Sequence, residues 1–165
     1  MNRRVKYICL ILLSLALTGC MPFATRTTIK QVTKSMENAV ARSIENSIGW
    51  ALTKDTVLLY NTISNRSDLM IINPDSSKIE GFEAFKEVSN SIWLSPKFMA
   101  TEYEIKDLKM SFSRNADVAW FSCLLDDICT WDGKSTGWEN VRWTGVLEQM
   151  DGQWIIQQMH FSFPD

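Results

Sequence analysis

Arg142 and His160 are the side chains whose types and spacing most suggest chemistry. Each lies in a segment where apolar residues alternate, and the dipeptide Asp151-Gly152 between those segments is typical of a tight β-hairpin. A hairpin would bring a permanent guanidinium cation close to a titratable imidazole. The pair could hold a carboxylate through two hydrogen bonds, or stabilise charge while the ring moves a proton.

Strand alternation extends this pair into a face, because Thr144 and Ser162 lie two residues from Arg142 and His160. If that face lines a cavity, we expect a ligand pocket formed by Arg142, Thr144, His160, Ser162, Tyr60, Trp93 and Trp120. The alternative is a structural role, with Arg142 paired to an acid and His160 hydrogen-bonded at the sheet.

Cys123 and Cys129 are the two cysteines outside the N-terminal segment. In an exported protein they could form a disulfide. Alternatively, Cys123 is a buried strand residue and Cys129 lies free in a loop. Their spacing and the single histidine match no standard zinc pattern, so we expect no metal and no other cofactor.

The N-terminal segment has the features of an export signal. Basic residues precede an apolar stretch over 7–17 that is too short to span a bilayer about 30 Å thick. The stretch ends in Leu-Thr-Gly-Cys at 17–20, which resembles the bacterial lipobox. That resemblance implies cleavage before Cys20, lipid on Cys20 and an exported, membrane-anchored protein. Because Met21 and not Asp follows, we expect the periplasmic side of the outer membrane in a Gram-negative host.

The expected organisation is a signal peptide at 1–19, a lipidated tether at 20–28 and one domain at 29–165. Loss of the signal removes Arg3, Arg4 and Lys6, which leaves 14 of the 17 Lys and Arg against 19 Asp and Glu, a net charge of −5. Nucleic acid is therefore excluded as a partner, since no basic surface could neutralise phosphates. The expected partner is the membrane, through the lipid on Cys20.

Hydrophobic periodicity in the domain changes from helical to strand-like along the chain. Helices are expected at 29–48, 50–63 and 81–93, with Gly49 interrupting the first two. Strands are expected at 69–72, 101–113, 116–125, 139–150 and 153–163. The polar segment 126–138 is expected to be a loop, where Trp131 and Trp138 could flank a pocket mouth or a dimer interface. Helices followed by an antiparallel meander predict the α+β class.

Several segments, taken in order, resemble SnoaL-like domains of the nuclear-transport-factor-2-like (NTF2-like) superfamily. They are N-P-D at 73–75, E-G-F-E-A-F at 80–85, V-A-W-F-S at 118–122, R-W-T-G-V-L at 142–147, D-G-Q-W at 151–154 and H-F-S-F-P at 160–164. The resemblance implies a cone in which N-terminal helices pack against a strongly curved antiparallel sheet around an open pocket. Members include isomerases, dehydratases, binding modules and oligomerisation hubs, so the fold alone does not give the function.

Ketosteroid isomerases of this superfamily carry an Asp general base just before a Pro, and here that position is Asn73. An amide cannot abstract a proton, and Asp68 or Asp75 could replace the base only if buried with a raised pKa. We therefore expect a non-catalytic module that binds a small carboxylate or apolar ligand, or that forms a homodimer. The alternative is a small isomerase, dehydratase or hydrolase whose candidate catalytic residues are His160, Arg142, Asp68 and Asp75.

Overall fold

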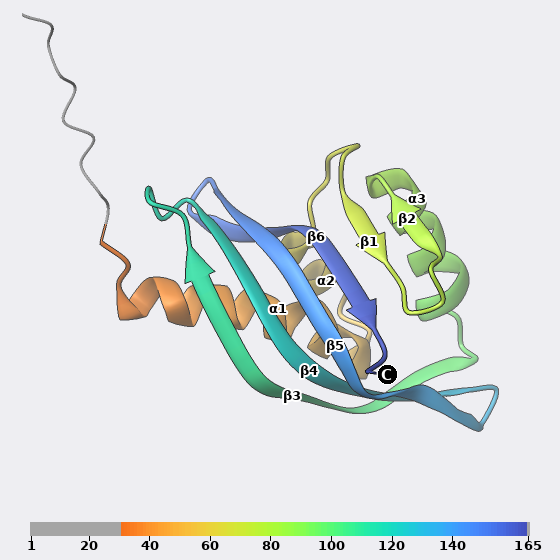
Figure 1. Ribbon diagram of the computed structural model, residues 1–165. Helices are drawn as coiled ribbons and strands as arrows, with labels where there is room; N and C mark the ends of the chain where they lie inside the picture. The colour runs from red at the N-terminus through yellow and green to blue at the C-terminus, as the bar shows by residue number, and fades with distance from the viewer. Residues whose placement is uncertain (1–30, 165) are drawn as a thin grey trace, which may run out of the picture.

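The computed structural model describes residues 31–164 of the chain. Three α-helices and a π-helical turn pack against one six-stranded sheet, and the helices α1 and α2 cover its concave face (Figure 1). The predicted signal peptide, the lipid site at Cys20 and the tether lie outside the described residues. No helix within 31–164 is long and apolar enough to cross a bilayer.

The long helix α1 spans Lys34–Thr53 and begins at Thr33, whose side chain accepts a hydrogen bond from the backbone N–H of Met36. Gly49 does not interrupt this helix, contrary to the sequence-based expectation. A Cβ at Gly49 would lie 2.9 Å from the Tyr103 hydroxyl oxygen, so glycine here allows the helix to approach the sheet closely.

The helix ends instead at Lys54, which adopts a left-handed conformation with φ 53°. Asp55 then caps the second helix, α2 (Thr56–Thr62), by accepting a 2.9 Å hydrogen bond from the backbone N–H of Leu58. The expected pair of N-terminal helices is therefore present, but the boundary between them lies five residues later than Gly49.

The third helix, α3 (Phe82–Val88), continues directly into the π-helical turn η1 (Ser89–Trp93). Ser89 is fully buried, and its hydroxyl donates a 2.7 Å hydrogen bond to the Phe85 carbonyl oxygen. The predicted helix at 81–93 is confirmed.

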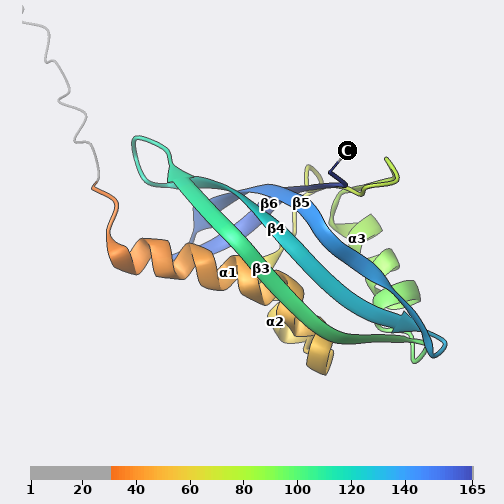
Figure 2. The ribbon, with the colours of Figure 1, turned by 60° about the horizontal axis from the view of Figure 1, so that its bottom comes forward.

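The sheet has the strand order β2-β1-β6-β5-β4-β3. Its main part is an antiparallel meander of β3 (Phe98–Phe112), β4 (Val118–Trp131), β5 (Lys134–Met150) and β6 (Gln153–Ser162). The short strand β1 (Met70–Ile72) pairs parallel to β6, and β2 (Lys78–Glu80) pairs antiparallel to β1. The sheet is therefore mixed, which corrects the purely antiparallel sheet expected from the sequence. Figure 2 shows the four long strands side by side with α1 against them.

The sequence suggested a loop at 126–138. In the structure this segment is the end of a long hairpin between β4 and β5. Its turn is Asp132-Gly133, with φ 52° and 76°. The predicted turn at Asp151-Gly152 is confirmed, with φ 49° and 83°. Polar residues here face solvent on an extended ribbon, which is why composition alone resembled a loop.

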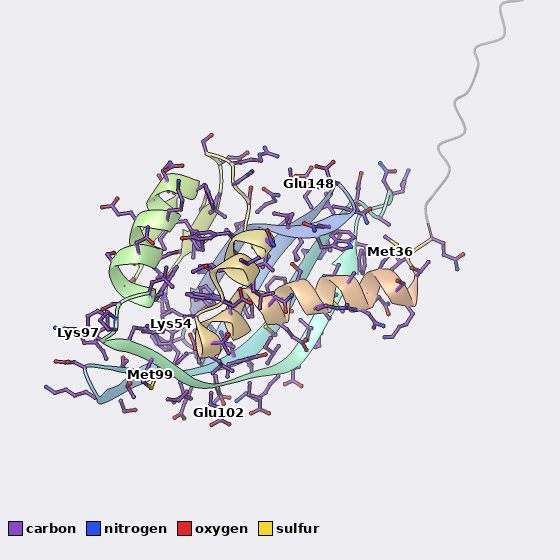
Figure 3. All side chains as sticks on the ribbon, turned by 180° about the vertical axis from the view of Figure 1, so that it is seen from behind. Met36, Lys54, Lys97, Met99, Glu102 and Glu148 are labelled. Carbon is purple, nitrogen blue, oxygen red and sulfur yellow. The ribbon has the colours of Figure 1, made fainter. Side chains whose placement is uncertain are left out.

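Bulges decide which side chains face the helices. At Asp107, with φ 54°, β3 gains one residue relative to β4, and its inward series changes from odd to even positions. On β6 the extra residue is Gln157, and the buried positions change from Trp154 and Ile156 to Met159 and Phe161. Seen from behind, Glu102 on β3 points away from the helices (Figure 3).

The two cysteines form no disulfide, which rules out the bridge considered from the sequence. Both lie on β4, where six residues of extended chain span roughly 20 Å. A disulfide requires Cα atoms closer than about 7 Å. Both thiols are buried, and burial raises the pKa of Cys123 to about 12 and that of Cys129 to about 11.

Candidate functional site

A cavity of about 100 Å³ lies inside the cone, between the helices and the concave face of the sheet. Its lining is mostly apolar and includes three polar side chains, Ser47, Asn73 and Asp127. The other lining residues are Ile48, Trp50, Ala51, Leu59, Ile63, Ile71, Phe85, Trp93, Phe98, Trp138, Met159 and Phe161. Such a cavity favours a small ligand that is largely apolar and carries one or two polar groups.

Asp127 is the one acidic or basic side chain among the described residues that line this cavity. Burial raises the pKa of its carboxyl from the ordinary value of 3.8 to about 6. Within residues 31–164, neither a hydrogen bond nor an ion pair to this carboxyl is found. Asp127 is thus a half-buried titratable group without a charged partner at an apolar cavity, a feature typical of functional sites.

The inward direction of Asp127 depends on how β5 pairs with β4. Asp127 is opposite Trp138, and a bulge at Asn140 turns Trp138 toward the cavity as well. A Cβ at Gly137 would lie 2.2 Å from the Asp127 carbonyl oxygen, so this close crossing requires glycine.

The bulge is held from the outer face of the sheet. Lys106 Nζ donates to Asp126 Oδ2 at 2.7 Å and to Asn140 Oδ1 at 2.6 Å. The backbone N–H of Asn140 donates to Asp126 Oδ1 at 2.6 Å. Two neighbouring acids therefore have opposite environments. Asp126 pairs with a lysine, and hydrogen bonds from Lys106 and Asn140 lower its pKa, whereas burial raises the pKa of Asp127.

Aromatic rings form both walls of the cavity. On the helical side, Trp93 packs edge-on against Trp50 at 6.4 Å and contacts Phe85 at 5.6 Å between ring centroids. On the sheet side, Trp138 packs against Phe161 at 5.4 Å. The cavity that Asp127 lines therefore has aromatic rings on both its helical and its sheet side.

A second, larger hollow of about 490 Å³ adjoins the cavity on the outside. The two spaces share Asn73, Trp93 and Trp138, so these residues stand between the interior and the surface. Asn73 is held by Ser77, because its side-chain nitrogen donates to Ser77 Oγ at 3.0 Å. This side of the cone is its mouth.

The residues predicted to line the pocket through strand parity lie on the opposite face of the sheet. Arg142 is opposite Ser162 and Thr144 is opposite His160, so the hairpin does bring them together. The side chains between them, including Trp143 and Phe161, face the core. The extra residue Gln157 shifts His160 outward, which corrects the expectation that this face lines the cone.

Tyr60 and Trp120 also lie away from the cavity lining, whereas Trp93 is part of it. The Tyr60 ring packs against Phe82 and Phe85 at 5.9 and 6.3 Å. The Trp120 side chain is 47% exposed on the outer face of β4. Tyr60 therefore belongs to the edge of the core, and Trp120 to the surface.

Neither proposed replacement base is buried beside the cavity. Asp68 is exposed and pairs with Arg66 at 2.5 Å. Asp75 is exposed, and hydrogen bonds from Ser77 lower the pKa of its carboxyl. Both acids therefore fail the condition set for a general base. No group of three or more His, Cys, Asp or Glu suited to a metal ion occurs in the described part of the chain.

Sequence reasoning misses Asp127 because the polar composition of 126–138 predicts a loop. A signal for it exists in the odd-numbered positions of β4 between 119 and 129, which are Ala119, Phe121, Cys123, Leu125, Asp127 and Cys129. All of these except Asp127 are buried and apolar, so an acid in that series indicates a carboxyl directed inward.

Replacing Asp127 with Asn should stabilise the protein at neutral pH. The folded state binds the proton of this carboxyl more tightly than the unfolded state does, so protonation of Asp127 stabilises the fold. This contribution is fully present below pH 3.8 and is lost as the pH rises to about 6. At pH 7.5 the ionised group costs roughly 3 kcal/mol, falling to about a third of that at pH 4.5. Urea unfolding at both pH values measures the difference.

The matched control is Asp132→Asn, which removes the same charge from the exposed hairpin turn. We expect it to change the free energy of unfolding little at either pH. Destabilisation by Asp127→Asn at pH 7.5 would contradict the environment described for this carboxyl.

Comparisons with known proteins agree with this architecture. The family model of the SnoaL-like domain matches residues 40–165. An NTF2-like protein from Cytophaga hutchinsonii is similar in structure, with TM-score 0.65, 14% identity, and coverage of 81% of this chain and 100% of the other. No curated protein matches the sequence.

Two further solved structures show the range of proteins that share the fold. The association domain of calcium/calmodulin-dependent kinase II from C. elegans has TM-score 0.58 and 12% identity, covering 79% of this chain and 97% of the other. A ketosteroid isomerase-like protein from Erwinia carotovora atroseptica has TM-score 0.59 and 16% identity, covering 79% and 97%. These identities show the fold alone. Because the family model matches residues 40–165, the chain belongs to the SnoaL-like domain family, and it has the fold of the NTF2-like proteins.

Proposed function

We propose that this protein is a lipid-anchored envelope protein whose cone interior binds a small, mostly apolar molecule at Asp127. The observation that supports the proposal most directly is the Asp127 carboxyl, which faces an apolar cavity and has no hydrogen-bonding partner among residues 31–164. Burying a carboxyl without a partner is costly, and a ligand that binds to it removes part of that cost.

Binding is better supported than catalysis by the arrangement of titratable groups. His160 and Arg142, the residues of the enzyme alternative, lie on the outer face of the sheet, where Arg142 Nη1 donates to the Phe163 carbonyl oxygen at 3.3 Å. The described lining of the cavity has no second acid, base or nucleophilic cysteine to work with Asp127. A proton-transfer mechanism normally requires such a second group or an electrostatic stabiliser.

The size of the cavity limits the part of the ligand that enters it. At about 100 Å³ it is smaller than the ~150 Å³ engineered cavity that accepts benzene. A group of about four to six non-hydrogen atoms therefore fits inside. A longer ligand would extend past Trp93 and Trp138 into the outer hollow.

The anchoring part of the proposal is supported by the sequence before the described domain. The basic residues, the short apolar stretch over 7–17 and the lipobox-like residues at 17–20 form an export and lipidation signal. The several acyl chains of a lipoprotein together give stable membrane attachment. The cone would then stand at the surface of the membrane, and we place it on the periplasmic side of the outer membrane if the host is Gram-negative.

Filling the cavity should abolish binding without unfolding the protein. Ala51 lines the cavity from α1, and Ala51→Leu adds three carbons while keeping a residue that favours helix. We expect a set of alcohols, amides, acids and amines with four to eight non-hydrogen atoms to yield compounds that raise the melting temperature of the wild type but not of Ala51→Leu. Saturation at 100 times the Kd stabilises by about 2.7 kcal/mol.

Ala41→Leu is the control, because Ala41 lies on the same helix outside the cavity lining. It should respond to the same compounds as the wild type does. Equal responses in Ala51→Leu would show that the compounds bind elsewhere.

The lipid anchor is tested by growth with radioactive palmitate. We expect the wild type and Cys9→Ala to incorporate the label, because Cys9 leaves with the signal peptide, and Cys20→Ala to incorporate none. Labelled Cys20→Ala protein would exclude Cys20 as the lipid site.

Self-association is a second candidate function, motivated by Trp120 on the outer face of the sheet. Its exposed ring borders a hollow that also contains Thr144, Val146 and Gln158. We place the contact of a homodimer on this face, because a large exposed aromatic residue beside a hollow is typical of interfaces.

Light scattering of the detergent-solubilised protein tests this placement. The wild type should have the mass of two chains and Trp120→Lys the mass of one. Trp131→Lys is the control, since Trp131 is exposed at the β4–β5 turn, away from this hollow. A monomeric wild type, or a dimeric Trp120→Lys protein, would contradict the assigned surface.

A further inference from the structure

We infer that the group bound inside the cone is a small organic cation, an ammonium or methylated ammonium, held between the Asp127 carboxylate and the aromatic walls. This inference deepens the proposed function and rests on it. It replaces the small carboxylate expected at Arg142 and His160, because those residues do not reach the cavity.

The first argument is the sign of the charge inside the cone. Asp127 supplies one negative charge when ionised, and no Lys or Arg occurs in the described lining of the cavity. Nearby lysines have other partners, since Lys54 Nζ donates to the Ser95 carbonyl oxygen at 2.6 Å and Lys106 pairs with Asp126 on the outer face. A bound cation would complete an ion pair that the protein leaves open, whereas an anionic ligand would be repelled.

The second argument is the aromatic content of the walls. The six aromatic lining residues are Trp50, Phe85, Trp93, Phe98, Trp138 and Phe161. Aromatic rings attract cations through their quadrupole, Trp most strongly, and the attraction grows when the cation is desolvated. Three Trp and one carboxylate in the same lining therefore suit a cation.

The third argument is the polarity of the remaining groups. The Ser47 hydroxyl donates its hydrogen to the Ile44 carbonyl oxygen at 2.8 Å, so its oxygen presents lone pairs to the cavity. Asn73 donates from its side-chain nitrogen to Ser77, which leaves its carbonyl oxygen as an acceptor. These two oxygens and the Asp127 carboxylate suit a ligand that donates hydrogen bonds or carries positive charge.

Binding of such a cation should depend on the ionisation of Asp127. Its neighbours on the inner face are Tyr103 on β3, Cys129 on β4 and Trp138 on β5. The Cys129 thiol stays protonated because burial and the Asp127 charge raise its pKa to about 11. With the pKa of Asp127 near 6, affinity for a permanent cation should fall between pH 7.5 and pH 5.

Three probes of similar shape and different charge test the inference. They are tetramethylammonium, the neutral tert-butanol and the anionic pivalate, each titrated by calorimetry into the full chain in detergent at matched ionic strength. We expect tetramethylammonium to bind at least about tenfold more tightly than tert-butanol, and pivalate not to bind. Affinity for tetramethylammonium should fall about tenfold at pH 5 and in Asp127→Asn, but not in Asp132→Asn.

The possible failures are distinguishable. Binding of tert-butanol or pivalate as tight as that of tetramethylammonium would overturn the inference while leaving the proposed binding function in place. The same conclusion would follow if tetramethylammonium bound equally well at pH 5 and pH 7.5, even if Asp127→Asn failed to fold. If none of the three probes bound and the compound set of the Ala51→Leu experiment also gave no ligand, both the inference and the proposed function would be wrong.

Discussion

The sheet of this protein has to bend around α1, and its strands change register at four places, near Thr101, Asp107, Asn140 and Gln157. A bulge adds a residue to one strand, increases the local twist and reverses which side chains face inward. The site depends most on the shifts at Asn140 and Gln157. They determine that Trp138 and Asp127 face the cavity, and that His160 does not.

The Asp127 carboxyl lowers the stability of the empty fold, but it can bind a ligand. A carboxyl directed into an apolar cavity disfavours its ionised form, and the Lys106–Asp126–Asn140 contacts hold the strands that keep it there from the outer face. Functional sites often retain groups that destabilise the empty fold, because a ligand later compensates for them. The mouth formed by Asn73, Trp93 and Trp138 supplies the route by which that ligand enters.

Sequence patterns predicted much of the fold but little of the site, and the difference has a physical origin. Helices, strands and the Asp151-Gly152 turn follow from local periodicity and turn chemistry, and the family match over 40–165 agrees with the resemblance found in the motifs. The prediction that His160 faces the cavity was wrong because one extra residue, Gln157, reverses the face of the strand on which His160 lies. Nothing in the composition of the strand indicates this extra residue. The inward direction of Asp127 could not be predicted, because an extended polar hairpin and a polar loop have the same composition.

The central claim is that Asp127 lies unpaired in an apolar interior, and its own titration tests this most directly. The measurement is the ¹³C chemical shift of its carboxyl carbon across pH 3 to 9 in aspartate-labelled protein, assigned by its loss in Asp127→Asn. The account predicts a midpoint near 6. A midpoint at or below about 4, the value of a solvated aspartate, would contradict it.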